Sequence, residues 1–443
     1  MSGPKVVRIV TREEHEAICR GMLARIDAAL EQWAEAGRRN DFLDAPAVEA
    51  ARRRRDALAA LAAQGRFAEM QVQAPAEESF LRSDMRFRLE KAAAAKAAAR
   101  THARRRSEAG VALIRAAAAA GVVLPDGVMS GLEQGEEAAL AEGFRALAAN
   151  RPTSHPKSTL AEQLRPGERT LSFSDWLAAQ PAAPTDPDID RIEARLEELV
   201  ALGEVVAIEP LRKRLTEASG APSSRRGLLL DGLEVESGRV LAEARKAADL
   251  MSALRVLLAE MAQAGLPVAA FAVSEDAAPA IKDIQARLGA AEAALARHRG
   301  DEAASARRAA VMKGLAGLGY EVREGMTTTF AASGRLVVAD ASRPGYGVEV
   351  SGAADGRQFQ MRPVAFTAPG ERADTSRDRD AETTWCGQVS ELSKTLAASG
   401  GGMEIVRALP IGATPLKRVA NADYGSVEGT EAMVTKERSM PKP

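Results

Sequence analysis

The residues best suited to covalent chemistry in this 443-residue chain are its two cysteines, Cys19 and Cys386. Cys386 follows Trp385 in the stretch DAETTWCGQVSELSKTLAASGGG, which spans 380–402. A cysteine acts as a nucleophile when a neighbouring base or cation favours its thiolate. Cys386 is therefore the candidate catalytic residue, and its chemistry depends on what lies beside it.

The usual partner of a catalytic cysteine is a histidine, and none lies in the expected C-terminal domain over 301–420. The chain has four histidines: His15, His102, His155 and His298. The residues around Cys386 instead form an apolar stripe at helical spacing: Trp385, Val389, Leu392 and Leu396. We expect the helix to start near this pair, with Cys386 in its first turn, where a helix N-terminus favours a thiolate. Trp385 is then either a core residue or a contact for a partner protein, and Cys386 is either structural or catalytic.

Other signatures of catalysis are missing from the sequence. There is no C-x-x-C or H-E-x-x-H metal motif, no G-x-x-x-x-G-K-[ST] phosphate loop and no G-x-S-x-G nucleophile motif. We therefore expect no metal and no cofactor. These absences favour a protein that is not an enzyme, with an enzyme using Cys386 kept as an alternative.

Two arginine runs could contact phosphates. They are Arg52, Arg53, Arg54 and Arg55 in one expected helix and Arg104, Arg105 and Arg106 in another. The simpler interpretation is a solvated helix face whose arginines pair with carboxylates. The alternative is a nucleic-acid-proximal subunit of a bacterial defence or DNA-handling complex, in which these helices contact a nucleic-acid backbone in a salt-sensitive way. The formal net charge of −1 supplies no general attraction to polyanions, so we do not favour nucleic acid as a partner.

A proline-rich segment over 151–187 has the composition of a linker. It contains one apolar island, TLSFSDWL, with Phe173, Trp176 and Leu177. The island is either a short helix packed on its own domain or a tethered motif that docks on a partner.

The segments on either side of the linker have helical patterns. Ala-rich and Arg-rich sequence with only 4% aromatic residues favours helix over 1–150. Thr11 with Glu14 forms a capping box, and Asp44 caps a second helix. A third helix is expected over about 77–120 and a fourth over about 130–149. Apolar residues at heptad spacing predict a helical hairpin or antiparallel coiled coil over 188–300.

The pattern changes from helical to alternating near Gly319. Turn signals at Pro344–Gly345 and Asp355–Gly356 separate short apolar runs, which predicts an antiparallel meander. A helix and a further strand follow, so 301–420 is expected to form an α+β domain, with a flexible tail over 421–443. The predicted fold class is mainly α, with helical hairpins or an antiparallel coiled coil, and a C-terminal α+β domain of meander plus helices.

These patterns together predict a scaffold or adaptor subunit of a multi-protein complex. Interrupted heptads, a linker with an apolar island and missing catalytic motifs are typical of such a protein. We expect other protein subunits as partners, among them an ATPase or a nuclease, and self-association is an open alternative. A bacterial, cytoplasmic protein fits the Ala/Arg-rich composition, the two distant cysteines, the lack of a signal-peptide core and the lack of an apolar membrane span.

Overall fold

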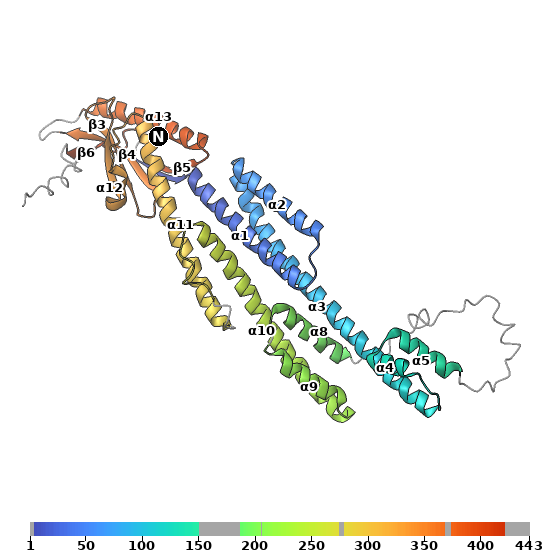
Figure 1. Cartoon of the computed structure of the whole chain (residues 1–443). Helices are drawn as coiled ribbons and strands as arrows, with labels where there is room; N and C mark the ends of the chain where they lie inside the picture. Colours follow the sequence, from blue (N-terminus) through green and yellow to red (C-terminus); the bar gives the residue numbers. More distant parts are fainter. Residues whose placement is uncertain (1–3, 150–186, 205, 274–278, 368–373, 421–443) are drawn as a thin grey trace, which may run out of the picture. The chain divides into compact units, whose positions relative to one another are not determined.

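The computed structural model describes residues 4–149, 187–204, 206–273, 279–367 and 374–420 (Figure 1). The first helices are α1 (Arg12–Arg39), α2 (Ala45–Ala63), α3 (Phe67–Ala119), α4 (Asp126–Gln134) and α5 (Glu137–Ala149). The later helices are α8 (Pro187–Leu202), α9 (Ile208–Gly220), α10 (Ser223–Gln263), α11 (Ile281–Gly317), α12 (Met326–Ser333) and α13 (Thr375–Ala398). The strands are β1 (Lys5–Val10), β2 (Arg335–Ala339), β3 (Tyr346–Gly352), β4 (Phe359–Thr367), β5 (Gly402–Ala408) and β6 (Lys417–Ala420). The fold is therefore mainly α with a C-terminal α+β part, as predicted, while the apolar island and the tail lie outside the described residues.

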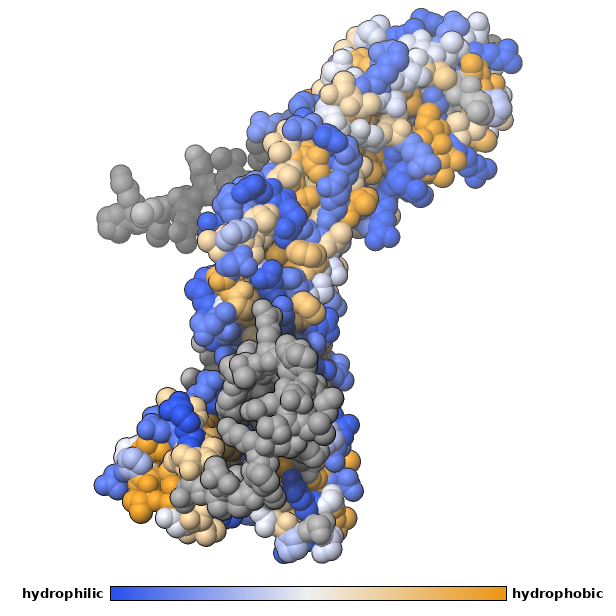
Figure 2. Space-filling view, turned by 90° about the vertical axis from the view of Figure 1, so that its right-hand side faces the viewer, coloured by the Kyte–Doolittle hydropathy of each residue, from blue (hydrophilic) through white to orange (hydrophobic). Residues whose placement is uncertain are grey.

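The chain forms two compact units, each made of segments that are distant in sequence. One unit contains 1–29, 49–79 and 253–443. The other contains 30–48 and 80–252. None of the helices within the described ranges is long and apolar enough to cross a membrane. Hydrophilic and apolar residues are interspersed on the face shown in Figure 2.

A single six-stranded sheet organises the first unit. Its strand order is β2-β3-β4-β1-β5, and β6 also pairs with β4. The meander β2-β3-β4 is antiparallel, as predicted. β1 pairs with the start of β4, and β6 pairs in parallel with its end. Residues 6–10 have the pattern of a short strand, as predicted, but nothing near them in the sequence indicated that they would lie inside this sheet.

One face of the sheet is covered by helices. The core on this face joins Val7 and Ile9 of β1 to Val348 of β3 and to apolar residues of α11 and α13. The predicted stripe of α13 is confirmed, because all four of its members are buried in this core: Trp385, Val389, Leu392 and Leu396. Figure 1 shows α13 lying along the sheet.

The start of α13 differs from the prediction. Asp374 is the N-cap, and its side chain accepts hydrogen bonds from the backbone N–H groups of Ser376 and Arg377, both at 3.1 Å. A capped start there is more stable than a start near Trp385, where no capping residue stands. Cys386 therefore lies in the middle of the helix, and its expected first-turn position is wrong.

Two other helix boundaries also differ. α3 begins at Phe67 and continues through Pro75, because Phe67, Met70 and Ala74 are buried and hold the first turns in place. The single helix expected over about 130–149 is two helices, α4 and α5. Gly135 separates them with a φ of 71°, a left-handed conformation that glycine adopts at little cost.

The heptad residues of the second unit form a three-helix core. Ile192, Leu196 and Leu199 of α8 pack with residues of α9 and α10. Ion pairs join Arg191 to Glu234 and Glu198 to Arg245, at 3.6 and 2.6 Å. Because both residue numbers rise together, α8 and α10 run in the same direction and α9 returns between them.

Candidate functional site

The Cys386 thiol accepts a hydrogen bond from a residue at the other end of the sequence. Lys5 of β1 pairs with Met361 of β4, which places its side chain on the helix-covered face of the sheet. Its Nζ donates to Cys386 Sγ at 3.6 Å. Lys5 is only 2% exposed, and among the described residues no carboxylate forms an ion pair with it. Cys386 itself is partly exposed.

Lys5 gives Cys386 a basic neighbour, the role that a histidine usually has beside a catalytic cysteine. A buried amine beside a thiol can accept its proton or, as an ammonium, stabilise the thiolate. The two residues are 381 positions apart, so local patterns could not connect them. The sequence contained one indication of an unusual site. Lys5 occupies the same alternating face as Val7 and Ile9, where an apolar residue would be expected.

Trp385 lies in the core of the sheet unit. It is 1% exposed and makes an edge-to-face contact with Tyr320, with ring centroids 6.2 Å apart. Burial, with help from the charge of Asp340, raises the pKa of the Tyr320 hydroxyl, which donates to Gln388 at 2.6 Å. No described residue accepts the indole N–H of Trp385. Contact between Trp385 and a partner protein stays a prediction, which needs this core to open.

The arginine run of α2 is largely paired with carboxylates. Arg53 contacts Glu49 at 3.2 Å within the helix. Arg54 contacts Glu77 at 2.9 Å. Arg55 binds Asp27 at 2.7 Å, and this hydrogen bond raises the pKa of the arginine despite partial burial. Arg52 is exposed.

The second run, in α3, is paired within the other unit. Arg104 forms ion pairs with Asp190 and Glu193 of α8, and Arg105 lies 3.7 Å from Asp190. Arg106 is exposed. Most arginines of the two runs thus contact acidic side chains, and contact of these runs with a nucleic acid stays a prediction.

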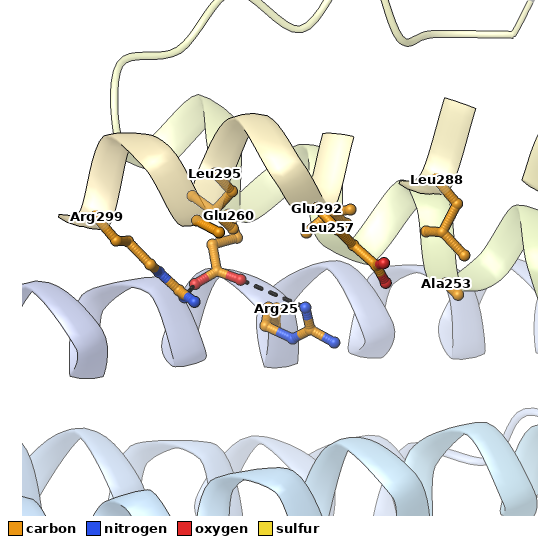
Figure 3. A pocket seen from close by; sticks show the side chains of 9 residues that line it. Arg25, Ala253, Leu257, Glu260, Leu288, Glu292, Leu295 and Arg299 are labelled. Carbon is orange, nitrogen blue, oxygen red and sulfur yellow. Dashed lines mark hydrogen bonds and ion pairs between the residues drawn. The ribbon is translucent and has the colours of Figure 1, made fainter. Parts of the chain in front are cut away.

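A cluster of ion pairs around two buried carboxylates, Glu78 and Glu260, joins four helices of the sheet unit. Arg25 of α1 binds both oxygens of Glu78 of α3, at 2.7 and 2.9 Å. It also contacts Glu260 of α10 at 3.4 Å, and Arg299 of α11 forms a second ion pair with Glu260 (Figure 3). Burial, together with the positive charge of Arg25, lowers the pKa of Arg299.

A cavity of about 230 Å³ lies beside this cluster. Figure 3 shows Arg299 and Glu260 toward one end of its lining and Leu288 at the other, with Leu257 and Glu292 between them. The cavity lining contains no cysteine, histidine, serine or threonine that could act as a nucleophile. In the described part of the chain, no group of three or more His, Cys, Asp or Glu residues could hold a metal ion. The ion pairs of the cluster connect α1, α3, α10 and α11 and so hold these four helices together.

Sequence reasoning missed this charge cluster. One local signal existed, because Gly21 stands in the middle of α1, where glycine weakens a helix. A Cβ at this position would collide with the Glu260 carboxylate. The close approach of α1 to Glu260 therefore explains the glycine.

Comparison with known proteins gives no relative from which a function could be inferred. No protein-family model, no curated protein and no solved structure matches the chain.

Proposed function

We propose that the chain is a non-enzymatic scaffold or adaptor subunit of a cytoplasmic multi-protein complex. It would join its partners through helical seams and through the C-terminal α+β part. The observation that carries the proposal is the free edge of strand β5.

β5 is the last strand of the sheet and pairs only with β1 among the described strands. Ile405 and Val406 on this strand are 46% and 47% exposed. The opposite edge is different, because the segment after α11 covers part of β2. There Glu321 N–H donates to the carbonyl of Ala339, and Ala341 N–H donates to Gly319.

An uncovered edge strand offers unpaired backbone groups to an extended segment of another protein. The register of β5 on β1 shifts between Val6 and Val7, so Val406 has no direct partner. Such an irregularity bends the edge and limits how far an added strand can pair. The proposal therefore expects a short partner segment beside Gly402–Ile405, with apolar side chains next to Ile405.

The test uses the purified full chain together with the products of neighbouring genes, among which an ATPase or a nuclease is the expected kind of partner. Light scattering would give the mass of any complex, and hydrogen exchange would report protection of the β5 amides. Ile405→Lys with Val406→Lys should abolish the complex, because charged residues on an edge oppose strand addition. A Val72→Lys variant is the control, because Val72 is an exposed valine on α3 of the same unit.

A chain that stays a monodisperse monomer with every candidate partner would contradict the proposal. If a complex forms but the β5 amides are not protected from exchange, the interface lies on the helices and not on β5. The cytoplasmic assignment rests on Cys19 and Cys386, neither of which forms a disulfide in the described part.

The second candidate function is an enzyme or a thiol sensor that uses Cys386, and the contact with Lys5 favours it. Cys386 should then be alkylated by iodoacetamide faster than Cys19, which is buried and whose thiol pKa is raised by that burial. Lys5→Met should slow alkylation of Cys386 and leave Cys19 unchanged. Equal Cys386 rates in wild type and Lys5→Met, at unchanged thermal stability, would leave Cys386 a structural residue.

A further inference from the structure

The face of the sheet that points away from the helices carries an excess of positive charge. We propose that this outer face binds the phosphate backbone of a nucleic acid, through a row of mainly polar side chains that crosses the strands from Arg335 to Arg407. This surface differs from the arginine runs of α2 and α3 and from the β5 edge.

The strand register defines the outer row. Leu336, Val350 and Met361 lie side by side on β2, β3 and β4 and are buried in the helix-covered core. Successive side chains of a strand point to opposite faces, so the neighbouring row points outward. That row consists of Arg335, Ser351, Gln360, Val6 and Arg407, one from each of five adjacent strands.

A buried carboxylate fixes the cations at one end of this face. Glu349 of β3 is 2% exposed and lies 2.5 Å from Arg335, 2.8 Å from Arg362 and 3.0 Å from Lys417. Each of these three cations remains about one-third to one-half exposed. One negative charge holds three positive charges in place, which leaves a preorganised excess of two.

The other end of the face adds two further cations. Arg407 of β5 is exposed, and among the described residues Arg8 of β1 makes only an exposed ion pair with Glu404, at 3.4 Å. An exposed pair of this kind contributes little and is easily exchanged for another anion. The outer face thus presents five cations against two carboxylates.

The geometry favours a nucleic acid over an acidic peptide. Four strand spacings of about 4.8 Å make the row roughly 19 Å long, which suits a chain of several charges. The inner strands β3, β4 and β1 already have neighbours on both sides, so a peptide lying across them would gain no backbone pairing. Phosphates need only side-chain donors, and arginine, serine and glutamine all supply them.

The same row predicts how the binding should behave. It contains no aromatic side chain, so bases have nothing to stack on and the binding should not depend on sequence. The chain has a formal net charge of −1, so attraction to a polyanion must be local. Binding should also weaken steeply with salt, because each phosphate contact releases counterions.

The experiment measures fluorescence anisotropy of a labelled 20-base-pair DNA duplex of mixed sequence with the full chain, across a salt series. The test variant is Arg335→Gln with Arg407→Gln, which leaves Arg362 and Lys417 on Glu349. Two lost phosphate contacts should reduce the slope of log affinity against log salt by about 1.8. A fourfold rise in salt should therefore weaken the wild type roughly tenfold more than the variant.

The matched control is Arg38→Gln with Arg39→Gln, which changes net charge equally at two exposed positions of α1, outside the arginine runs. It should bind like the wild type, and thermal unfolding should show that both variants are folded. Absence of duplex binding by the wild type at low salt would overturn the proposal. An equal loss in the control would also overturn it, as would capture of a polyglutamate peptide without capture of the duplex.

Discussion

Three ionisable side chains that the protein buries decide much of its local chemistry. Lys5 is buried against a thiol, Glu349 beneath three cations and Glu260 between two arginines. A buried charge is costly unless a partner compensates it. Each of these residues therefore marks a place where the fold needs a specific partner. Lys5 and Cys386 are far apart in the sequence, whereas Arg335 and Arg362 lie on the strands next to Glu349.

Glu349 should make the free energy of unfolding depend on pH in the acid range. Burial alone would raise its pKa, but hydrogen bonds from Arg362 and Lys417 and the charges of Arg362 and Arg335 outweigh burial, so the pKa is lowered. A lowered pKa in the folded state contributes stability above the pKa of the unfolded state, and this contribution is lost as pH falls through the folded value. We expect Glu349→Gln to lower the unfolding free energy near pH 7 and to flatten its fall below about pH 4. Urea unfolding at several pH values measures both effects, and an unchanged acid dependence would contradict the role of Glu349.

Trp385 should contribute to stability mainly through packing. Trp385→Ala is expected to cost about 3–5 kcal/mol of unfolding free energy, because the ring is buried. Trp385→Phe should cost much less, since no described residue accepts the indole N–H and an aromatic ring would still meet Tyr320. Denaturant unfolding compares the two variants. A stable Trp385→Ala protein that only loses a partner would instead make Trp385 an interface residue.

At the scale of elements, the bounds of a helix depend on both its capping residues and the burial of its side chains. The predicted bounds of three helices were wrong because only one of these two factors was considered at each. Asp374 starts α13 almost three turns before the Trp385–Cys386 pair. Burial of Phe67 and Met70 carries α3 through Pro75, a residue that usually ends a helix. Gly135 divides a continuous apolar pattern into two helices.

The packing of α1 on α10 gives a test at this scale. Gly21→Ala should improve the helix propensity of α1 by up to about 1 kcal/mol. Its methyl group would displace the buried Glu260 carboxylate from Arg25 and Arg299, and the loss of these contacts to a buried charge should outweigh the gain in propensity. We therefore expect net destabilisation, measured by thermal or urea unfolding. Gly289→Ala in α11 is the control, because nothing lies within 4 Å of a Cβ there, and it should be neutral or stabilising.

At the scale of the whole molecule, the two compact units are built from segments that the sequence separates widely. The sheet unit needs β1, which lies between β4 and β5 and contributes Val7 and Ile9 to the core. Without β1, strand β5 has no neighbour among the described strands. The C-terminal part of the chain is therefore not expected to keep its sheet on its own.

A chain that begins at residue 11 tests this dependence. Its β5 amides should exchange with solvent rapidly, and its unfolding midpoint should fall, because a central strand is lost. A synthetic peptide of residues 1–12 added in trans should restore protection of β5. Full protection of β5 without the peptide would show that the sheet does not need β1.

The sequence by itself determined the mainly helical character, the change to an α+β part near Gly319, the meander and the apolar stripe of α13. These features depend on periodicity, capping and turn residues within a few positions of one another. Tertiary structure alone decided that β1 joins the C-terminal sheet, that Lys5 lies beside Cys386, and that Arg25 and Arg299 enclose Glu260. Contacts between residues that are distant in the sequence depend on which surfaces pack against each other. The spacing of residues within one segment contains no information about that packing.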